Sequence, residues 1–291
     1  MRFKAFLCSL CLLVVLLPGC AQEEPCQVAA TTLPVYQFTA AICAGTDIQV
    51  KQLITQQVSC LHDYSLNVSQ VRTLETAEVV VISGGGLEEF MEDTLQQANR
   101  VIDSSTDVPM LACEEEHHED HEGHHHDQDA HIWLSPDNAK IMTYNIAKGL
   151  AAVYPQYADR FAYNLSILNE QFDALKEYGQ LRLGDLSCRE MITFHDGFGY
   201  FATAFDLHIL EAIEEESGSE ASARELKEMI ALVQEHQLPA VFTEVSGSAS
   251  AAGIISAETG AKVFALDMAM AGNDYFEAMY HNIDTIREAM K

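Results

Sequence analysis

The chain of 291 residues has little positive charge: 16 Lys and Arg stand against 44 Asp and Glu, which gives a formal net charge of −28 at pH 7. Such a protein repels a phosphate backbone, which excludes nucleic acid as a partner. None of the cysteines after residue 20 stands in a Cys-x-x-Cys pair, which argues against a zinc ribbon or a thioredoxin-type redox site. The sequence also lacks a nucleophile elbow and a GxGxxG loop, which argues against an α/β-hydrolase or a nucleotide-binding protein.

Long apolar runs are absent after the first twenty residues. Arg2 and Lys4 precede an apolar run over residues 5–17, which is shorter than the ~20 residues of a membrane-spanning helix and typical of a signal peptide. We therefore expect residues 1–19 to be a signal peptide. The following LPGC (17–20) resembles the lipobox of bacterial lipoproteins, which implies an exported protein held by a lipid on Cys20 at the outer face of the cytoplasmic membrane. The alternative is an ordinary cleaved signal with Cys20 in a disulfide.

Five cysteines follow Cys20, and outside the cytoplasm they can form bridges with one left over: Cys26, Cys43, Cys60, Cys113 and Cys188. Cys26 starts an expected strand and Cys43 ends the helix that returns from it, so both fall at the same end of the sheet. This placement favours a bridge between Cys26 and Cys43. A second bridge between Cys60 and Cys113 would tether a His-rich loop, described next.

Strand and helix patterns alternate in two stretches of the chain, which is typical of parallel sheets covered on both faces. Between them a helical periodicity runs from Asp137 to about residue 181, interrupted at Pro155. The sequence therefore predicts an α/β fold with two Rossmann-like parallel-sheet domains joined by a long backbone helix. We expect the N-terminal domain over residues 20–150, the linking helix over 151–183 and the C-terminal domain over 184–291.

Half of the twelve histidines fall within one strongly acidic segment, the His-rich loop of residues 114–128. No apolar side chain in this segment could anchor it in a core, so it is expected to be mobile. Imidazoles and carboxylates together favour weak, multi-site binding of transition metals over a merely solvated loop. The histidines concerned are His117, His118, His121, His124, His125 and His126.

Three other histidines, His62, His131 and His195, each stand where a strand pattern or loop ends. Ligands of open α/β sheets bind at the carboxyl ends of strands, so this placement suggests a shared site. A lone histidine there is more often structural. Three together, in an exported protein with a His-rich loop, favour metal binding.

The segments around these histidines resemble the zinc- and manganese-binding solute-receptor lipoproteins of bacterial ABC transporters. The matching motifs are LHDY (61–64), DAHIWLSPDN (129–138), HDGFGYF (195–201) and, most weakly, FALDM (264–268). The likeness covers nearly the whole mature chain. The sequence departs from the family at Cys60 and Leu61, at Ala130 where a proline is usual, and at Met268 and Ala269.

The resemblance implies one divalent cation held by His62, His131, His195 and Asp267 in a cleft between the domains. Glu244 or a water molecule is the alternative fourth ligand. Three imidazoles and one carboxylate suit Zn²⁺, and the manganese branch of the family has a glutamate where this chain has His195, so Mn²⁺ is the alternative cargo.

A closed ligand shell favours carriage of the metal over hydrolysis, so the protein is not expected to be an enzyme. By resemblance, it is a monomer that delivers the ion to an ABC transporter permease and its ATPase. A surface adhesin is a second reading. An exported metallohydrolase with Glu244 as general base is a third.

Overall fold

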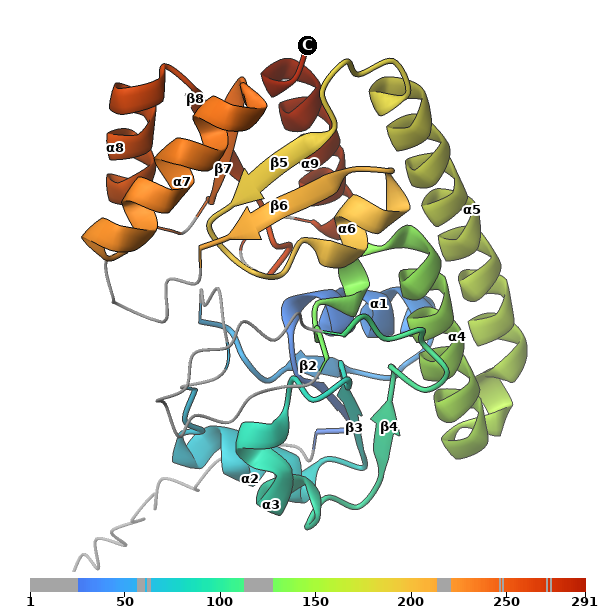
Figure 1. Ribbon diagram of the computed structural model, residues 1–291. Coiled ribbons are helices and arrows are strands. Elements are labelled where there is room, and N and C mark those ends of the chain that lie inside the picture. The colour runs from blue at the N-terminus through green and yellow to red at the C-terminus, as the bar shows by residue number, and fades with distance from the viewer. Residues whose placement is uncertain are drawn as a thin grey trace, which may run out of the picture.

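The computed structural model describes residues 26–56, 61, 64–112, 128–213, 221–245, 247, 249–270, 272 and 274–291. These residues form two four-stranded parallel sheets with helices packed around them (Figure 1). The predicted α/β class with two parallel-sheet units is confirmed. No helix among the described residues is long and apolar enough to cross a membrane.

The N-terminal sheet has the strand order β2-β1-β3-β4 and is parallel throughout. Its middle strands are short runs of small and β-branched residues that are almost entirely buried, as expected for a sheet covered on both faces. Its strands are β1 Val28–Ala30, β2 Val50–Gln52, β3 Val79–Ile82 and β4 Val101–Asp103. Its helices are α1 Leu33–Cys43, α2 Val68–Thr76 and α3 Glu92–Leu95.

The C-terminal sheet repeats this arrangement with the order β6-β5-β7-β8, so that β5 lies between β6 and β7. Its strands are β5 Glu190–Thr193, β6 His208–Ala212, β7 Ala240–Glu244 and β8 Lys262–Leu266. Its helices are α6 Gly199–Ala204, α7 Ala223–His236, α8 Ser250–Thr259 and α9 Tyr275–Ala289.

Two long helices connect the units: α4 Pro136–Val153 and α5 Ala158–Leu183. The Ser135 hydroxyl caps α4 and Pro136 occupies its first turn, where a missing N–H costs nothing. A single 3-10 turn over Pro155–Tyr157 separates the helices. The linking helix therefore begins at Ala158 rather than at residue 151, because Pro155 lacks the N–H that would continue α4. At ~1.5 Å per residue, α5 is about 39 Å long and runs past both sheets (Figure 1).

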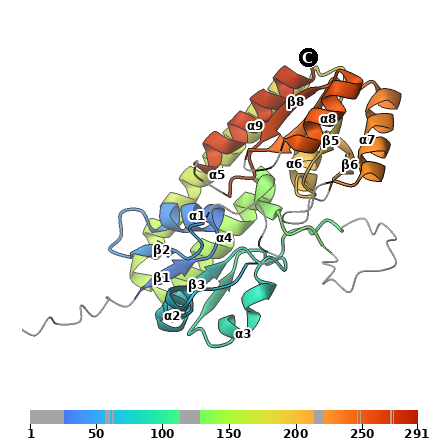
Figure 2. The ribbon, with the colours of Figure 1, turned by 90° about the vertical axis from the view of Figure 1, so that its left-hand side faces the viewer.

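One apolar core extends across the junction of the two units. At its centre Phe38 of α1, Phe172 of α5 and Tyr275 of α9 meet edge to face, with ring centroids 4.9 to 5.8 Å apart. The turned view shows α1 lying between the two sheets (Figure 2). The units are therefore packed firmly against each other, and the candidate site lies at this junction.

Candidate metal centre

His131 is held by an aspartate two residues before it. It stands just ahead of the one-turn 3-10 helix Ile132–Leu134 that leads into α4, and it is 7% exposed. Asp129 Oδ1 accepts a hydrogen bond from the His131 backbone N–H and lies 2.8 Å from Nδ1 of the ring. A carboxylate only accepts, so Nδ1 carries the ring proton and Nε2 is left with its lone pair.

His195 is held in the same manner by a residue distant in sequence. It follows β5, and its Nδ1 lies 3.1 Å from Oε1 of Glu244, the last residue of β7. Since β5 and β7 are neighbours in the sheet, their carboxyl ends bring these side chains together. Glu244 is 7% exposed, and its carboxylate faces the Nδ1 side of the His195 ring.

The two imidazoles converge on one point. Nε2 of His131 and Nε2 of His195 are 3.3 Å apart, and the rings are nearly perpendicular at 86°. Two nitrogens bound at ~2.0–2.1 Å to one tetrahedral zinc ion stand roughly 3.3 to 3.4 Å from each other. Both Nδ1 atoms face carboxylates, and the two Nε2 atoms face each other at a separation that a shared cation fits.

Gly197 allows this close approach. A Cβ at this position would lie 2.7 Å from Cδ2 of His195, 2.7 Å from Cε of Met268 and 3.0 Å from Cε1 of His131. The main chain of the HDGFGYF segment thus rests directly against both rings. The methyl end of Met268, which follows the predicted fourth ligand, lies beside them.

Asp267 lies directly after β8 and is almost fully buried. Asn282 of α9 fixes its main chain, accepting from the Asp267 N–H and donating to the Asp267 carbonyl, both at 2.7 Å. One carboxylate oxygen accepts from the Ala269 N–H at 2.8 Å. Trp133 donates its indole N–H to the Met268 carbonyl at 2.8 Å, which links this segment to the His131 side of the junction.

The described residues therefore bring together two of the four predicted ligands as a close pair. In the described part of the chain, no group of three or more His, Cys, Asp or Glu side chains is arranged to hold a metal ion. His62 lies outside the described residues, and so do Cys20, Cys60, Cys113 and the six histidines of the His-rich loop. Leu61 and Tyr64, on either side of His62, are described, and the Tyr64 N–H donates to the Leu61 carbonyl at 3.0 Å.

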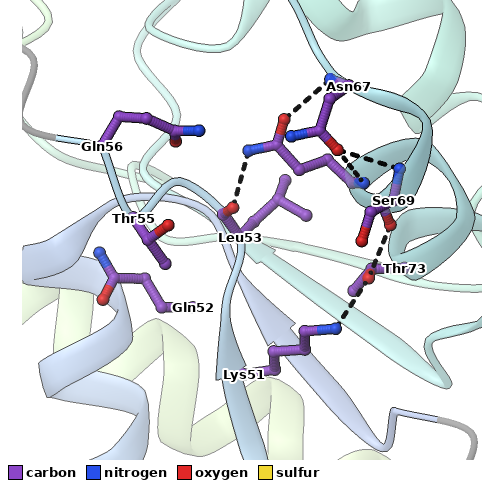
Figure 3. A pocket seen from close by; sticks show the side chains of 9 residues that line it. Lys51, Gln52, Leu53, Thr55, Gln56, Asn67, Ser69 and Thr73 are labelled. Atoms are coloured by element: carbon purple, nitrogen blue, oxygen red, sulfur yellow. Dashed lines mark hydrogen bonds between the residues drawn. The ribbon is translucent and has the colours of Figure 1, made fainter. Parts of the chain in front are cut away.

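A hollow of about 170 Å³ lies between the end of β2 and the start of α2, away from the two histidines (Figure 3). Its polar groups are bonded to one another: Gln70 donates to the Leu53 carbonyl, and Asn67 caps α2. Lys51 enters it and donates to Thr73 Oγ1 at 3.2 Å. A lysine with amides and hydroxyls does not suit a divalent cation, so this cavity is not the metal site.

The family model described as ZnuA, zinc-uptake complex component A, periplasmic, matches residues 28–289. The chain belongs to this family. A crystal structure of ZnuA has 29% sequence identity and a TM-score of 0.79, over 92% of this chain and all of that one. The zinc-binding lipoprotein AdcA of Streptococcus pneumoniae is 27% identical over 99% of this chain, which spans only 60% of that protein.

A third relative shares the fold alone. The laminin-binding protein of Streptococcus agalactiae has 24% identity and a TM-score of 0.79, over 91% of this chain and 99% of that one. The family is described as a periplasmic component of a zinc-uptake complex, and the AdcA relatives are named as zinc-binding proteins.

The expected bridge between Cys26 and Cys43 is wrong: both are free thiols, as is Cys188. The two do fall at the same end of the first sheet, but Cys26 Sγ donates to the Val28 carbonyl at 3.3 Å instead. Burial raises the pKa of Cys43 to about 12, so this thiol stays protonated and unreactive. A common sheet end does not by itself bring two sulfur atoms into bonding geometry.

Sequence reasoning missed the role of Asp129 in orienting His131, and it offered Glu244 as an alternative fourth ligand, whereas the carboxylate of Glu244 faces Nδ1 of His195. The signal for Asp129 was present, since a carboxylate two residues before a ligand can reach its ring. The pairing of Glu244 with His195 depends on the neighbourhood of β5 and β7, which no local pattern contains.

Proposed function

We propose that the protein captures Zn²⁺ at the junction of its two units, with His62, His131, His195 and Asp267 as ligands. The observation that carries this proposal is the 3.3 Å separation of the two Nε2 atoms, each with its Nδ1 turned to a carboxylate. Ring orientation by outer carboxylates is a general feature of histidine ligands to metals. The motif around His62 supports a third imidazole, and the buried carboxylate of Asp267 after β8 supports the fourth ligand.

Zinc is favoured over manganese by the ligand chemistry. Three nitrogens and one oxygen form a four-coordinate shell of the kind zinc adopts, whereas manganese favours oxygen ligands. The names of ZnuA and of AdcA point to the same ion.

We further propose that Cys20 carries a lipid anchor and that the monomeric receptor delivers its ion to an ABC permease and ATPase. The family description as a component of a zinc-uptake complex and the name of AdcA as a lipoprotein support this role. An adhesive function is the second candidate. Its support is that the Streptococcus agalactiae relative is described as both an adhesin and a metal transporter, with a likeness in fold alone.

Zinc titration of the mature protein tests the site. We expect one tight equivalent per chain, and a loss of at least about a hundredfold in affinity in His131→Ala and in His195→Ala, because each removes one of four ligands. His236→Ala is the matched control, because that ring also pairs with a carboxylate, Glu190, but lies outside the site.

Anomalous diffraction at the zinc edge then identifies the atoms around the ion. Deletion of residues 114–128 should leave the tight site intact. Retention of tight binding in both His→Ala variants, or its disappearance on deletion of the loop, would show that the site lies elsewhere.

A further inference from the structure

Tyr200 links the C-terminal unit to the segment that carries Asp129. It is the second residue of α6 and is 3% exposed, with its ring in the core and its hydroxyl at the junction of the units. The hydroxyl accepts a hydrogen bond from the Leu111 N–H at 2.9 Å and donates one to the Asp129 carbonyl at 2.9 Å. One phenol group thus satisfies two main-chain groups of the N-terminal unit, which a phenylalanine could not do.

The two segments that Tyr200 joins also pair with each other. The Asp129 N–H donates to the Leu111 carbonyl at 3.0 Å, and Ala112 and Gln128 form an antiparallel bridge. These residues flank the His-rich loop in sequence. Gly199 packs closely here, since a Cβ on it would lie 3.1 Å from Asp129 Oδ2. The start of α6 therefore rests on the paired segments and fixes where Asp129 stands.

A continuous set of contacts leads from Tyr200 to the metal site. Asp129 is held through its carbonyl by Tyr200, and its carboxylate holds both the main chain and the ring of His131. The His131 ring in turn faces His195, which precedes Tyr200 by only five residues. Residues 195–200 of the C-terminal unit thus carry both the His195 imidazole and the Tyr200 hydroxyl. That hydroxyl holds Asp129, the residue that orients the His131 ring.

We propose that Tyr200 is a positioning residue of the metal site. By holding Asp129 in place, its hydroxyl keeps the proton of His131 on Nδ1 and turns Nε2 toward His195. This inference rests on the proposed zinc site for its functional meaning, but the ring tautomer exists in the metal-free protein and can be measured there.

The test uses the mature, metal-free protein labelled with ¹⁵N at histidine, at a pH where the rings are neutral. Nitrogen chemical shifts distinguish the two tautomers of His131. We expect the wild type to hold His131 in the Nδ1–H form, and Tyr200→Phe to populate both forms and to bind zinc about tenfold more weakly. A merely structural role for Tyr200 would not change the tautomer of a ring that it does not touch.

Tyr178→Phe is the matched control, because it removes a hydroxyl that bonds Asp284 on the exterior of the molecule. This variant should leave both the tautomer and the zinc affinity unchanged. If Tyr200→Phe fails to fold, Asp129→Ala replaces it, because that variant removes the carboxylate while the Tyr200 hydroxyl stays in place.

The outcomes separate this inference from the proposed function. A wild-type His131 tautomer in Tyr200→Phe, or in Asp129→Ala if that variant replaces it, overturns the positioning role even if zinc binds as proposed. A shifted tautomer in a protein that does not bind zinc supports the positioning role and contradicts the proposed function.

Discussion

The two sheets have the same strand order, and each has a buried glutamate at the carboxyl end of its third strand, but the two carboxylates are used differently. Glu88, next to β3, accepts hydrogen bonds from the Ser83 and Gly84 N–H groups and from the Thr31 hydroxyl. Glu244, at the end of β7, faces the His195 ring instead. In one unit the buried glutamate therefore stabilises its own loop, whereas in the other it faces a predicted metal ligand. The chemistry of the site cannot be inferred from the fold alone.

The largest effect, a loss of zinc affinity, is expected from a methyl group added in the C-terminal unit. In Gly197→Ala the new Cβ would lie within 3.0 Å of both imidazoles and of Met268, so the rings must move apart. We expect zinc affinity, measured by competition with a chromophoric chelator, to fall by about a hundredfold, as it can when the groups that orient a metal's ligands are disturbed. Gly253→Ala in α8 is the control, because a Cβ there meets nothing within 4 Å. Equal zinc affinities in the two variants would contradict the close packing of the site.

The matching glycine-to-alanine change in the N-terminal unit should affect the free energy of unfolding alone. Gly84 has a φ of 83°, and a Cβ on it would lie 2.0 Å from Asp103 Oδ1. Gly84→Ala is therefore expected to lower the free energy of unfolding by roughly 1 to 3 kcal/mol, as strained backbone positions do. Chemical denaturation measures this change. The zinc affinity should stay within about twofold of the wild type, since Glu88 and its loop hold no predicted ligand.

Glu88 should also make the stability of the protein depend on pH. Burial raises the pKa of Glu88 from 4.5 to about 7, against the opposing effect of the hydrogen bonds that it accepts. Between these values the folded protein keeps a proton that the unfolded chain has released. The free energy of unfolding should therefore fall as pH rises from about 4.5 to 7, by on the order of 2 kcal/mol from this group.

Denaturation curves across this pH window, for the wild type and for Glu88→Gln, measure that contribution. The difference in stability between the two proteins should shrink as pH falls, because the wild-type carboxyl becomes neutral. Glu75→Gln on the exposed face of α2 is the control and should run parallel to the wild type. A constant difference between Glu88→Gln and the wild type would mean that Glu88 does not titrate in this window.

Much of this molecule could be predicted from its sequence, and the parts that could not depend on tertiary pairing. The buried apolar run at Val79–Ile82 and the long helical periodicity of α4 and α5 are local signals, and they gave the fold class. Motifs located His131 and His195. Strand order, the contact of Glu244 with His195 and the free state of Cys26 all depend on which segments become neighbours in space, which no periodicity encodes.

A substitution at Glu244 tests its contact with His195 directly. Glu244→Gln keeps the shape of the side chain and removes its charge, so the His195 ring loses the carboxylate that orients it and raises its basicity. We expect zinc affinity to fall about tenfold with little change in thermal stability. The same substitution at Glu190, whose carboxylate lies 2.9 Å from Nδ1 of His236 outside the site, should leave zinc affinity unchanged. An unchanged affinity in Glu244→Gln as well would show that His195 needs no carboxylate.

The smallest effect is expected at the far end of the helix that joins the two units. Near its start, Asn164 of α5 donates two hydrogen bonds, at 2.8 Å each, to the buried carbonyl of Ile42 and the partly buried carbonyl of Ala44 in the N-terminal unit. Near its end, Arg182 pairs with Asp284 of α9, and both side chains are more than 40% exposed. Water and salt screen the exposed pair, so Arg182→Gln should lower the free energy of unfolding only slightly, and by less at high ionic strength. Asn164→Ala leaves the buried Ile42 carbonyl and the partly buried Ala44 carbonyl without this partner and should cost roughly 1 to 3 kcal/mol at any ionic strength. Denaturation at low and high salt measures the loss in stability of each variant. Equal losses in Arg182→Gln and Asn164→Ala would contradict this prediction, because the exposed ion pair would then hold α5 as firmly as the amide hydrogen bonds do.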